Sequence, residues 1–194
     1  SPHLEPIGVH AFGASNVLDG GALADHIRAT VVLAGRIATG AGFPLRLVDV
    51  GGGLGIPYEA HEESLDLVGF ESRLARLAAG WAGDPVTRNA RILLEPGRYL
   101  VGPAGAYVAR VVDRKTIGGR DVVVLDGGIH HLLRPALVGQ EHRVRRLVAG
   151  PNAASRFVPV TIVGPLCSGL DVLATETMLQ APEPGDLLAV LDVG

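Results

Sequence analysis

The chain has 194 residues, of which 47% are hydrophobic, and a mean hydropathy of +0.32, so it can bury a core. A formal charge of -3 and an aromatic content of 4% exclude nucleic-acid binding through bulk electrostatics or a base-stacking surface. The single cysteine excludes an internal disulfide framework and agrees with a cytoplasmic location, and neither a membrane-spanning run nor a secretory leader is visible.

The first hundred residues predict a parallel α/β unit. Apolar residues at helical spacing predict one helix over 18–39, ended by Gly40-Ala41-Gly42, and a second over 62–82. The predicted strands are 7–12, 45–50 and 91–94. Strand, helix, strand, helix, strand is the order of a parallel sheet covered by helices.

After Gly102-Pro103 the pattern changes to β-type stretches with no strong helix between them. These cover 107–114, 121–125, 158–163 and 187–191, and Gly118-Gly119 predicts a hairpin turn. We therefore predict two domains, 1–102 and 103–194. A full (β/α)8 barrel needs about 250 residues, so the first domain has room for only three βα units of a barrel.

A glycine-rich segment, Gly51-Gly52-Gly53-Leu54-Gly55, follows the second predicted strand. Glycines let backbone N–H groups approach an anion without Cβ clashes, so the segment can cradle a phosphate. It matches neither the dinucleotide pattern nor the P-loop. A tight turn into the next helix is an equally good interpretation of the segment by itself.

Glu95 lies at the C-terminal end of an apolar strand, where barrels place catalytic groups. A carboxylate there needs a partner. That partner is either a ligand or, in the structural alternative, Arg98 or Arg91.

Two other features suggest a metal site and a reactive lysine, but the sequence around them supports neither. His130 and His131 are adjacent, and neighbours on a strand face opposite sides, so we predict no metal site. The only lysine, Lys115, lies at a hairpin end beside Arg114 and is expected to be solvated.

Taken in order, the motifs resemble those of the fold-type III pyridoxal phosphate (PLP) decarboxylases, the diaminopimelate, ornithine and arginine decarboxylase group. The resemblance covers essentially the whole chain. It rests on Gly8-Val9-His10-Ala11-Phe12-Gly13-Ala14-Ser15, Asp49-Val50-Gly51-Gly52-Gly53-Leu54-Gly55, Glu95-Pro96-Gly97-Arg98, Asp126-Gly127-Gly128, Arg134-Pro135-Ala136-Leu137 and Gly164-Pro165-Leu166-Cys167-Ser168-Gly169-Leu170-Asp171.

The resemblance implies the C-terminal part of an alanine racemase-like, PLP-binding TIM barrel, followed by a Greek-key β-barrel domain. It implies a lyase of amino-acid biosynthesis that works as a homodimer with its active site at the subunit interface. The implied substrate is a small or carrier-protein-tethered amino acid.

For the cofactor, the resemblance implies phosphate contacts from Gly52, Gly53 and Ser15, and a pyridinium contact from Glu95. The segment Gly97-Arg98 would serve the phosphate or a substrate carboxylate. Phe12 stands where many members have a histidine stacked on the PLP ring. For the nearby His10 we favour plain barrel packing.

For the substrate, the resemblance implies that Cys167 reaches the PLP of the partner subunit and reprotonates the product, and that Arg134 binds a carboxylate. Ser168 replaces the acidic residue that binds a distal ammonium. This replacement points to the branch that decarboxylates amino acids tethered to an acyl carrier. Asp171 remains as a substrate-binding or a structural residue.

The Schiff-base lysine of the family has no counterpart in this chain. We expect that segment to precede Ser1, and a tyrosine-containing phosphate segment to follow Gly194, so the chain resembles an inactive C-terminal fragment. One alternative is a non-catalytic homologue that binds PLP or a partner. Another is an amino-acid racemase, which would need a tyrosine as second base.

Overall fold

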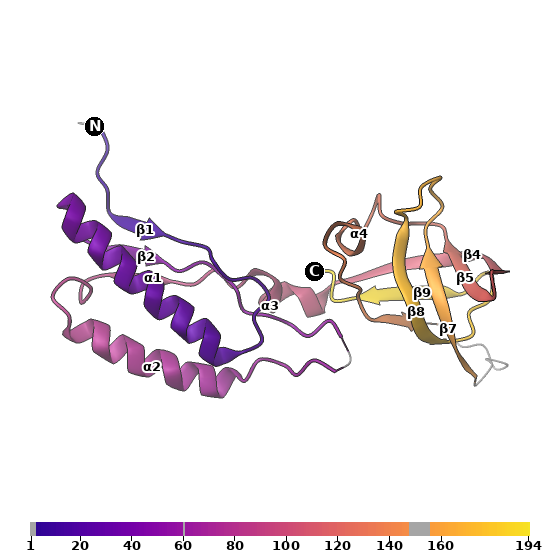
Figure 1. Cartoon of the computed structure of the whole chain (residues 1–194), viewed down its shortest axis with the longest axis horizontal. Coiled ribbons are helices and arrows are strands. Elements are labelled where there is room, and N and C mark those ends of the chain that lie inside the picture. Colours follow the sequence, from indigo (N-terminus) through magenta and orange to yellow (C-terminus); the bar gives the residue numbers. More distant parts are fainter. Residues whose placement is uncertain (1–2, 60, 148–155) are drawn as a thin grey trace. The chain divides into compact units, whose positions relative to one another are not determined.

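The computed structural model describes residues 3–59, 61–147 and 156–194, and the chain divides into two compact units. The first unit comprises Ser1–Pro57 and Glu63–Leu100. The second comprises Tyr58–Glu62 and Val101–Gly194. The chain therefore gives a short segment, Tyr58–Glu62, to the second unit long before the main crossing at Leu100. Figure 1 shows both units, with most of their helices and strands labelled.

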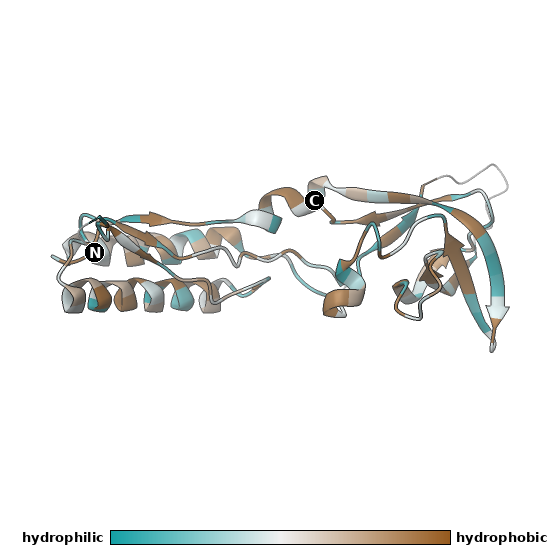
Figure 2. Cartoon of the chain, turned by 90° about the horizontal axis from the view of Figure 1, so that it is seen from above, coloured by the Kyte–Doolittle hydropathy of each residue, from teal (hydrophilic) through white to brown (hydrophobic). Residues whose placement is uncertain are grey.

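The first unit is an α/β layer, as the sequence predicts. Its parallel sheet has the order β1-β2-β3, with the strands at Gly8–His10, Leu47–Asp49 and Arg91–Leu93. The long helices are α1 (Gly20–Ala41) and α2 (Leu67–Gly83), and a short helix α3 (Gly97–Val101) runs into a 3-10 turn, Gly102–Ala104. The core contains the fully buried Leu23, Ile27 and Val31 of α1 and Val48 of β2. Figure 2 shows apolar and polar residues alternating along both long helices.

The helix boundaries follow from their caps. The carboxylate of Asp19 accepts hydrogen bonds from the backbone N–H groups of Gly21 and Ala22 at the start of α1, and Gly42 ends the helix with a left-handed φ of 70°. The prediction that the second helix begins at residue 62 is wrong. Asp66 is the N-cap of α2 and accepts from the N–H of Gly69. The carboxylate of Glu62 instead closes a turn, with Tyr58 and Glu59 as donors.

The second unit is a mixed β-barrel. Its sheet has the order β6-β9-β4-β5-β7-β8, and the two end strands, β6 and β8, contact each other. Of the pairs among the described strands, β5–β7 is parallel and the others are antiparallel. The strands are β4 (Ala106–Ile117), β5 (Arg120–Leu125), β6 (Val144–Arg146), β7 (Phe157–Val163), β8 (Val172–Gln180) and β9 (Leu187–Leu191).

Four of these strands are predicted correctly, and the hairpin between β4 and β5 is confirmed by φ angles of 58° and 80° at Gly118 and Gly119. The sequence did not predict β6, β8 or the short helix α4 (Arg134–Val138). β8 is interrupted by a left-handed residue, Glu176, with φ 50°, which breaks its alternation. The barrel core includes the fully buried Val123, Leu125 and Ile162.

Within the described residues, no helix is both long and apolar enough to cross a membrane.

Candidate functional site

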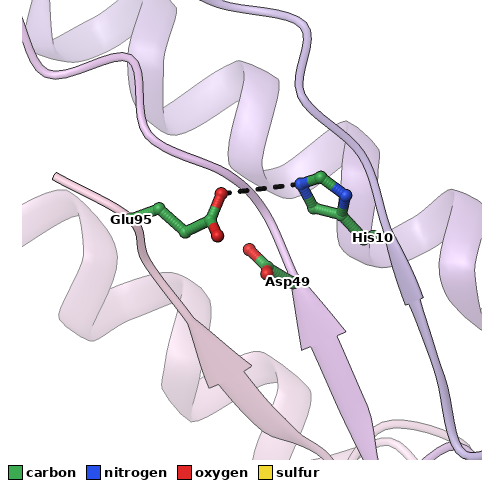
Figure 3. A group of neighbouring side chains, drawn as sticks. All are labelled: His10, Asp49 and Glu95. Atoms are coloured by element: carbon green, nitrogen blue, oxygen red, sulfur yellow. Dashed lines mark ion pairs between the residues drawn. The ribbon is translucent and has the colours of Figure 1, made fainter. Parts of the chain in front are cut away.

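Three side chains meet at the carboxyl ends of the parallel strands. His10 ends β1, Asp49 ends β2, and Glu95 follows β3 by two residues. The Nε2 atom of His10 lies 3.6 Å from a carboxylate oxygen of Glu95, and one ligand atom of each residue lies within 4.8 Å of the others. Figure 3 shows the three groups turned toward one another. The strand ends therefore form one polar site, as expected for a parallel sheet.

His10 differs from its predicted packing role. Its side chain is 55% exposed, and that of Glu95 is 51% exposed. Glu95 thus has a histidine beside it, where the structural alternative placed Arg98 or Arg91. The sequence predicted a strand over 7–12, with His10 inside it, whereas β1 ends at His10 and so brings this side chain level with Asp49 and Glu95.

The glycine loop is tied to this site by backbone hydrogen bonds. The N–H of Gly51 donates to the carboxylate of Asp49 at 2.9 Å, and the N–H of Glu95 donates to the carbonyl of Gly51 at 2.9 Å. Gly51 and Gly53 have φ angles of 70° and 102°, which favour glycine. At Gly52, a Cβ would collide with the carbonyl oxygen of Glu95. Gly51 and Gly52 are buried and Gly53 is half-buried, so the loop packs closely against the strand ends.

The loop does not lead directly into a helix, so the alternative interpretation of the segment, a tight turn into the next helix, is wrong. α2 begins only at Leu67, so any anion held at Gly52 and Gly53 would depend on loop N–H groups and not on the end of that helix. On its other side the loop is bonded to the segment after β1. The N–H of Val17 donates to the carbonyl oxygen of Gly53, and the N–H of Gly55 donates to the carbonyl oxygen of Val17.

The other predicted cofactor residues of the first unit lie around this loop. Phe12 is 61% exposed, and its ring is next to Gly51. Ser15 is exposed in the bend between β1 and α1. Gly97 opens the short helix α3, and Arg98 follows it in a half-buried position. The structure thus groups Phe12 and the glycine loop beside the three polar strand-end residues.

The remaining predicted residues all lie in the second unit. Arg134 is half-buried at the start of α4, and its Nη2 donates to Oε1 of Gln140 at 2.6 Å. Cys167 and Ser168 are exposed on the loop between β7 and β8. The hydroxyl of Ser168 accepts a hydrogen bond from the N–H of Leu170.

Asp171 is only 2% exposed, which favours its structural role over substrate binding. Its carboxylate accepts hydrogen bonds from the N–H groups of Ile129 and Leu166, both at 2.8 Å. A Cβ at Gly128 or Gly164 would collide with this carboxylate. The buried charge therefore joins the loop that carries Cys167 to the turn that follows β5.

The histidine pair and Lys115 both lie in the second unit. His130 and His131 lie in a turn and not on a strand, and their ring centroids are 3.9 Å apart. His131 Nδ1 lies 3.1 Å from the hydroxyl of Tyr107, whose pKa is raised by burial and by the charges of Asp126 and Asp171. Lys115 is half-exposed and paired with Asp113, as expected for a solvated lysine.

The strand-end residues also include the donor types of a metal site, which the sequence did not predict. The carboxylates and the imidazole are close enough to hold a cation. Exposed acidic groups are nevertheless common without one. The three residues by themselves therefore do not define a metal centre.

Comparison with known proteins agrees with this geometry. Residues 17–194 match the family described as "Pyridoxal-dependent decarboxylase, C-terminal sheet domain". The chain is 33% identical over 191 residues to the diaminopimelate decarboxylase of Methanothermobacter thermautotrophicus, which covers 98% of this chain and 44% of the relative. It is 31% identical over 200 residues to the L-glutamyl-[BtrI acyl-carrier protein] decarboxylase of Niallia circulans, covering 97% of this chain and 45% of the relative.

A solved structure shows the same fold. Diaminopimelate decarboxylase from Helicobacter pylori, complexed with L-lysine, superposes with a TM-score of 0.80 at 28% identity, covering 98% of this chain and 44% of that one. The chain belongs to the pyridoxal-dependent decarboxylase family, and both relatives described above are decarboxylases by name. It spans less than half the length of the relatives it matches.

The burial of Asp171 generates a prediction about the second unit. Replacing Asp171 by alanine leaves the N–H groups of Ile129 and Leu166 without their acceptor, so we expect a loss of about 1–3 kcal/mol of unfolding free energy. The control is Asp113→Ala, at an exposed ion pair, with an expected change within about 0.5 kcal/mol. Urea unfolding followed by circular dichroism, with amide exchange at Ile129 and Leu166, measures both. Equal unfolding free energies and exchange rates in the two variants would contradict a structural role for Asp171.

Proposed function

We propose that the protein containing this chain is a PLP-dependent amino-acid decarboxylase and that the strand-end site holds the pyridine side of the cofactor. The observation that carries the proposal is the glycine loop bonded to both Asp49 and Glu95. One backbone segment thereby joins a glycine-rich loop, whose half-buried Gly53 would offer its N–H group to an anion, with two carboxylates that favour a cation. A phosphorylated pyridinium has both charges.

The residues present fit that group. Gly53 is half-buried and has no side chain to cover its backbone, the buried Gly52 packs against the backbone of Glu95, and Ser15 adds an exposed hydroxyl. Glu95 provides an accessible carboxylate for the protonated ring nitrogen. The exposed Phe12 ring provides an apolar face for stacking but no hydrogen bond. PLP, when bound, supplies an electron sink for the bond that breaks when CO2 leaves.

The second unit provides the proposed substrate-handling groups. Arg134 would bind a substrate carboxylate through its planar guanidinium. We propose that the exposed Cys167 donates a proton from Sγ to the substrate carbon that has lost CO2, in the active site of a partner subunit of a homodimer. Arg98 would serve the phosphate or the same carboxylate.

The substrate would have no ammonium group at its distal end. Ser168 is neutral and exposed, and a hydroxyl does not replace a carboxylate as the partner of an ammonium. The similarity to the carrier-protein glutamate decarboxylase of Niallia circulans supports an acyl-tethered substrate. We therefore propose an amino acid linked through its distal carboxyl group to a carrier.

The glycine loop provides the first test. Gly52→Ala is expected to weaken PLP binding by at least about tenfold, because the new methyl group displaces the backbone of Glu95 from the loop. Equilibrium dialysis and the PLP absorbance spectrum measure the affinity. Binding of pyridoxal, which has no phosphate, is expected to change less. The control is Gly40→Ala, where a Cβ meets nothing within 4 Å. Equal PLP affinities for Gly52→Ala and the unchanged protein would overturn the phosphate assignment.

The substrate proposal is tested on the active holoenzyme with three compounds. These are a glutamyl thioester of pantetheine, L-lysine and meso-diaminopimelate, with CO2 release as the measurement. We expect the thioester to have the highest kcat/KM, and Ser168→Glu to raise the relative rate with L-lysine by restoring a charge opposite the ammonium. A preference of the unchanged enzyme for L-lysine or diaminopimelate would show that the substrate proposal is wrong.

The 194-residue chain by itself is expected to release no CO2 from any of these compounds. Its only lysine, Lys115, is on β4 and paired with Asp113, so a lysine from outside this sequence must complete the site. The measurement is CO2 release by the purified 194-residue polypeptide supplied with PLP. Sustained turnover by that polypeptide would refute the expectation.

A further inference from the structure

Tyr58 is enclosed by two side chains of the second unit. Tyr58 is only 4% exposed. The Cζ atom of Arg134 lies 5.2 Å from the centre of the Tyr58 ring, and the ring of His142 meets it edge-on, with centroids 4.8 Å apart and planes at 74°. The first contact has the geometry of a cation–π interaction. The tyrosine ring therefore forms one wall of the environment of Arg134.

Both neighbours of the ring are fixed by further hydrogen bonds. Arg134 donates from Nη2 to Oε1 of Gln140 at 2.6 Å. Nδ1 of His142 lies 2.9 Å from the carbonyl oxygen of Leu191 in β9. Because each neighbour has its own attachment to the barrel, the ring of Tyr58 has little freedom to move without losing a contact.

The backbone of Tyr58 is held in place by a charged group. The carboxylate of Glu62 accepts hydrogen bonds from the N–H groups of Tyr58 at 2.7 Å and Glu59 at 3.0 Å. These backbone hydrogen bonds lower the pKa of Glu62. The carboxylate is therefore ionised at neutral pH, where it accepts most strongly, and the turn keeps the Tyr58 ring against Arg134.

We propose that Tyr58 is a positioning residue that orients the Arg134 guanidinium for the carboxylate of the substrate. The ring covers the guanidinium, and the bond to Gln140 fixes its rotation about the side-chain axis. An arginine recognises a carboxylate through a planar fork, so its orientation decides how well two parallel hydrogen bonds form. This inference rests on the proposed function, since Arg134 is assigned there to substrate binding.

The test compares three variants of the holoenzyme. Tyr58→Leu removes the aromatic face, and we expect KM to rise by about three- to tenfold with little change in kcat, in keeping with the strength of a partly buried cation–π contact. Tyr58→Phe keeps the face and loses only the hydroxyl, so KM is expected to stay within about twofold of the unchanged enzyme. Leu179→Ala, at an equally buried position of the barrel core, is the control for general destabilisation and is expected to leave KM unchanged.

A second measurement does not depend on turnover. The NMR signal of the Arg134 Nε–H group is expected to move or broaden in Tyr58→Leu and to stay in place in Tyr58→Phe and Leu179→Ala. If no amino acid is decarboxylated, the proposed function fails while this signal still decides whether Tyr58 positions Arg134. An unmoved signal in Tyr58→Leu would overturn the inference, as would Tyr58→Phe or Leu179→Ala raising KM as much as Tyr58→Leu.

Discussion

The absence of room for a side chain at Gly52 is the constraint on which the strand-end site depends. A Cβ there would collide with the carbonyl oxygen of Glu95, and the neighbouring Gly51 is bonded to both Asp49 and Glu95. The close approach fixes where the chain enters and leaves the ends of β2 and β3. The same backbone contacts place the carboxylates of Asp49 and Glu95 beside the glycine loop. The close packing of the backbone by itself therefore requires glycine at this position.

Asp171 has an equivalent organising role in the β-barrel, although the interaction is of another kind. Its buried carboxylate joins the turn after β5 to the loop before β8, and Gly128 and Gly164 leave the space that it fills. Cys167 is exposed on that loop. A reactive thiol needs access to its substrate and a defined position. The buried aspartate gives the loop its position without covering the thiol.

The sequence predicted the elements with strong periodicity and missed those defined by long-range contacts. The structure confirms the predicted helix α1 and the hairpin at Gly118-Gly119. Both elements follow from local residue preferences, which a sequence pattern reveals. β6 and β8 depend on pairing with β9 and β7, which no local pattern reveals. In the site, motif order led to Glu95 and the glycine loop. The nearness of His10 to Glu95 depends on the register of β1, β2 and β3, which fixes which strand ends are level.

The strand-end site carries an excess of acidic groups. Two carboxylates and one imidazole lie within 4.8 Å of one another, and like charges at such distances repel by about 1 kcal/mol in water and by more where water is excluded. The half-exposed state of His10 and Glu95 limits that repulsion. A ligand that covered the site would remove the water that screens it, and positive charge on that ligand would offset the repulsion between the two carboxylates. The protonated pyridine of the proposed cofactor would bring such a charge, whereas a neutral aromatic ring would not.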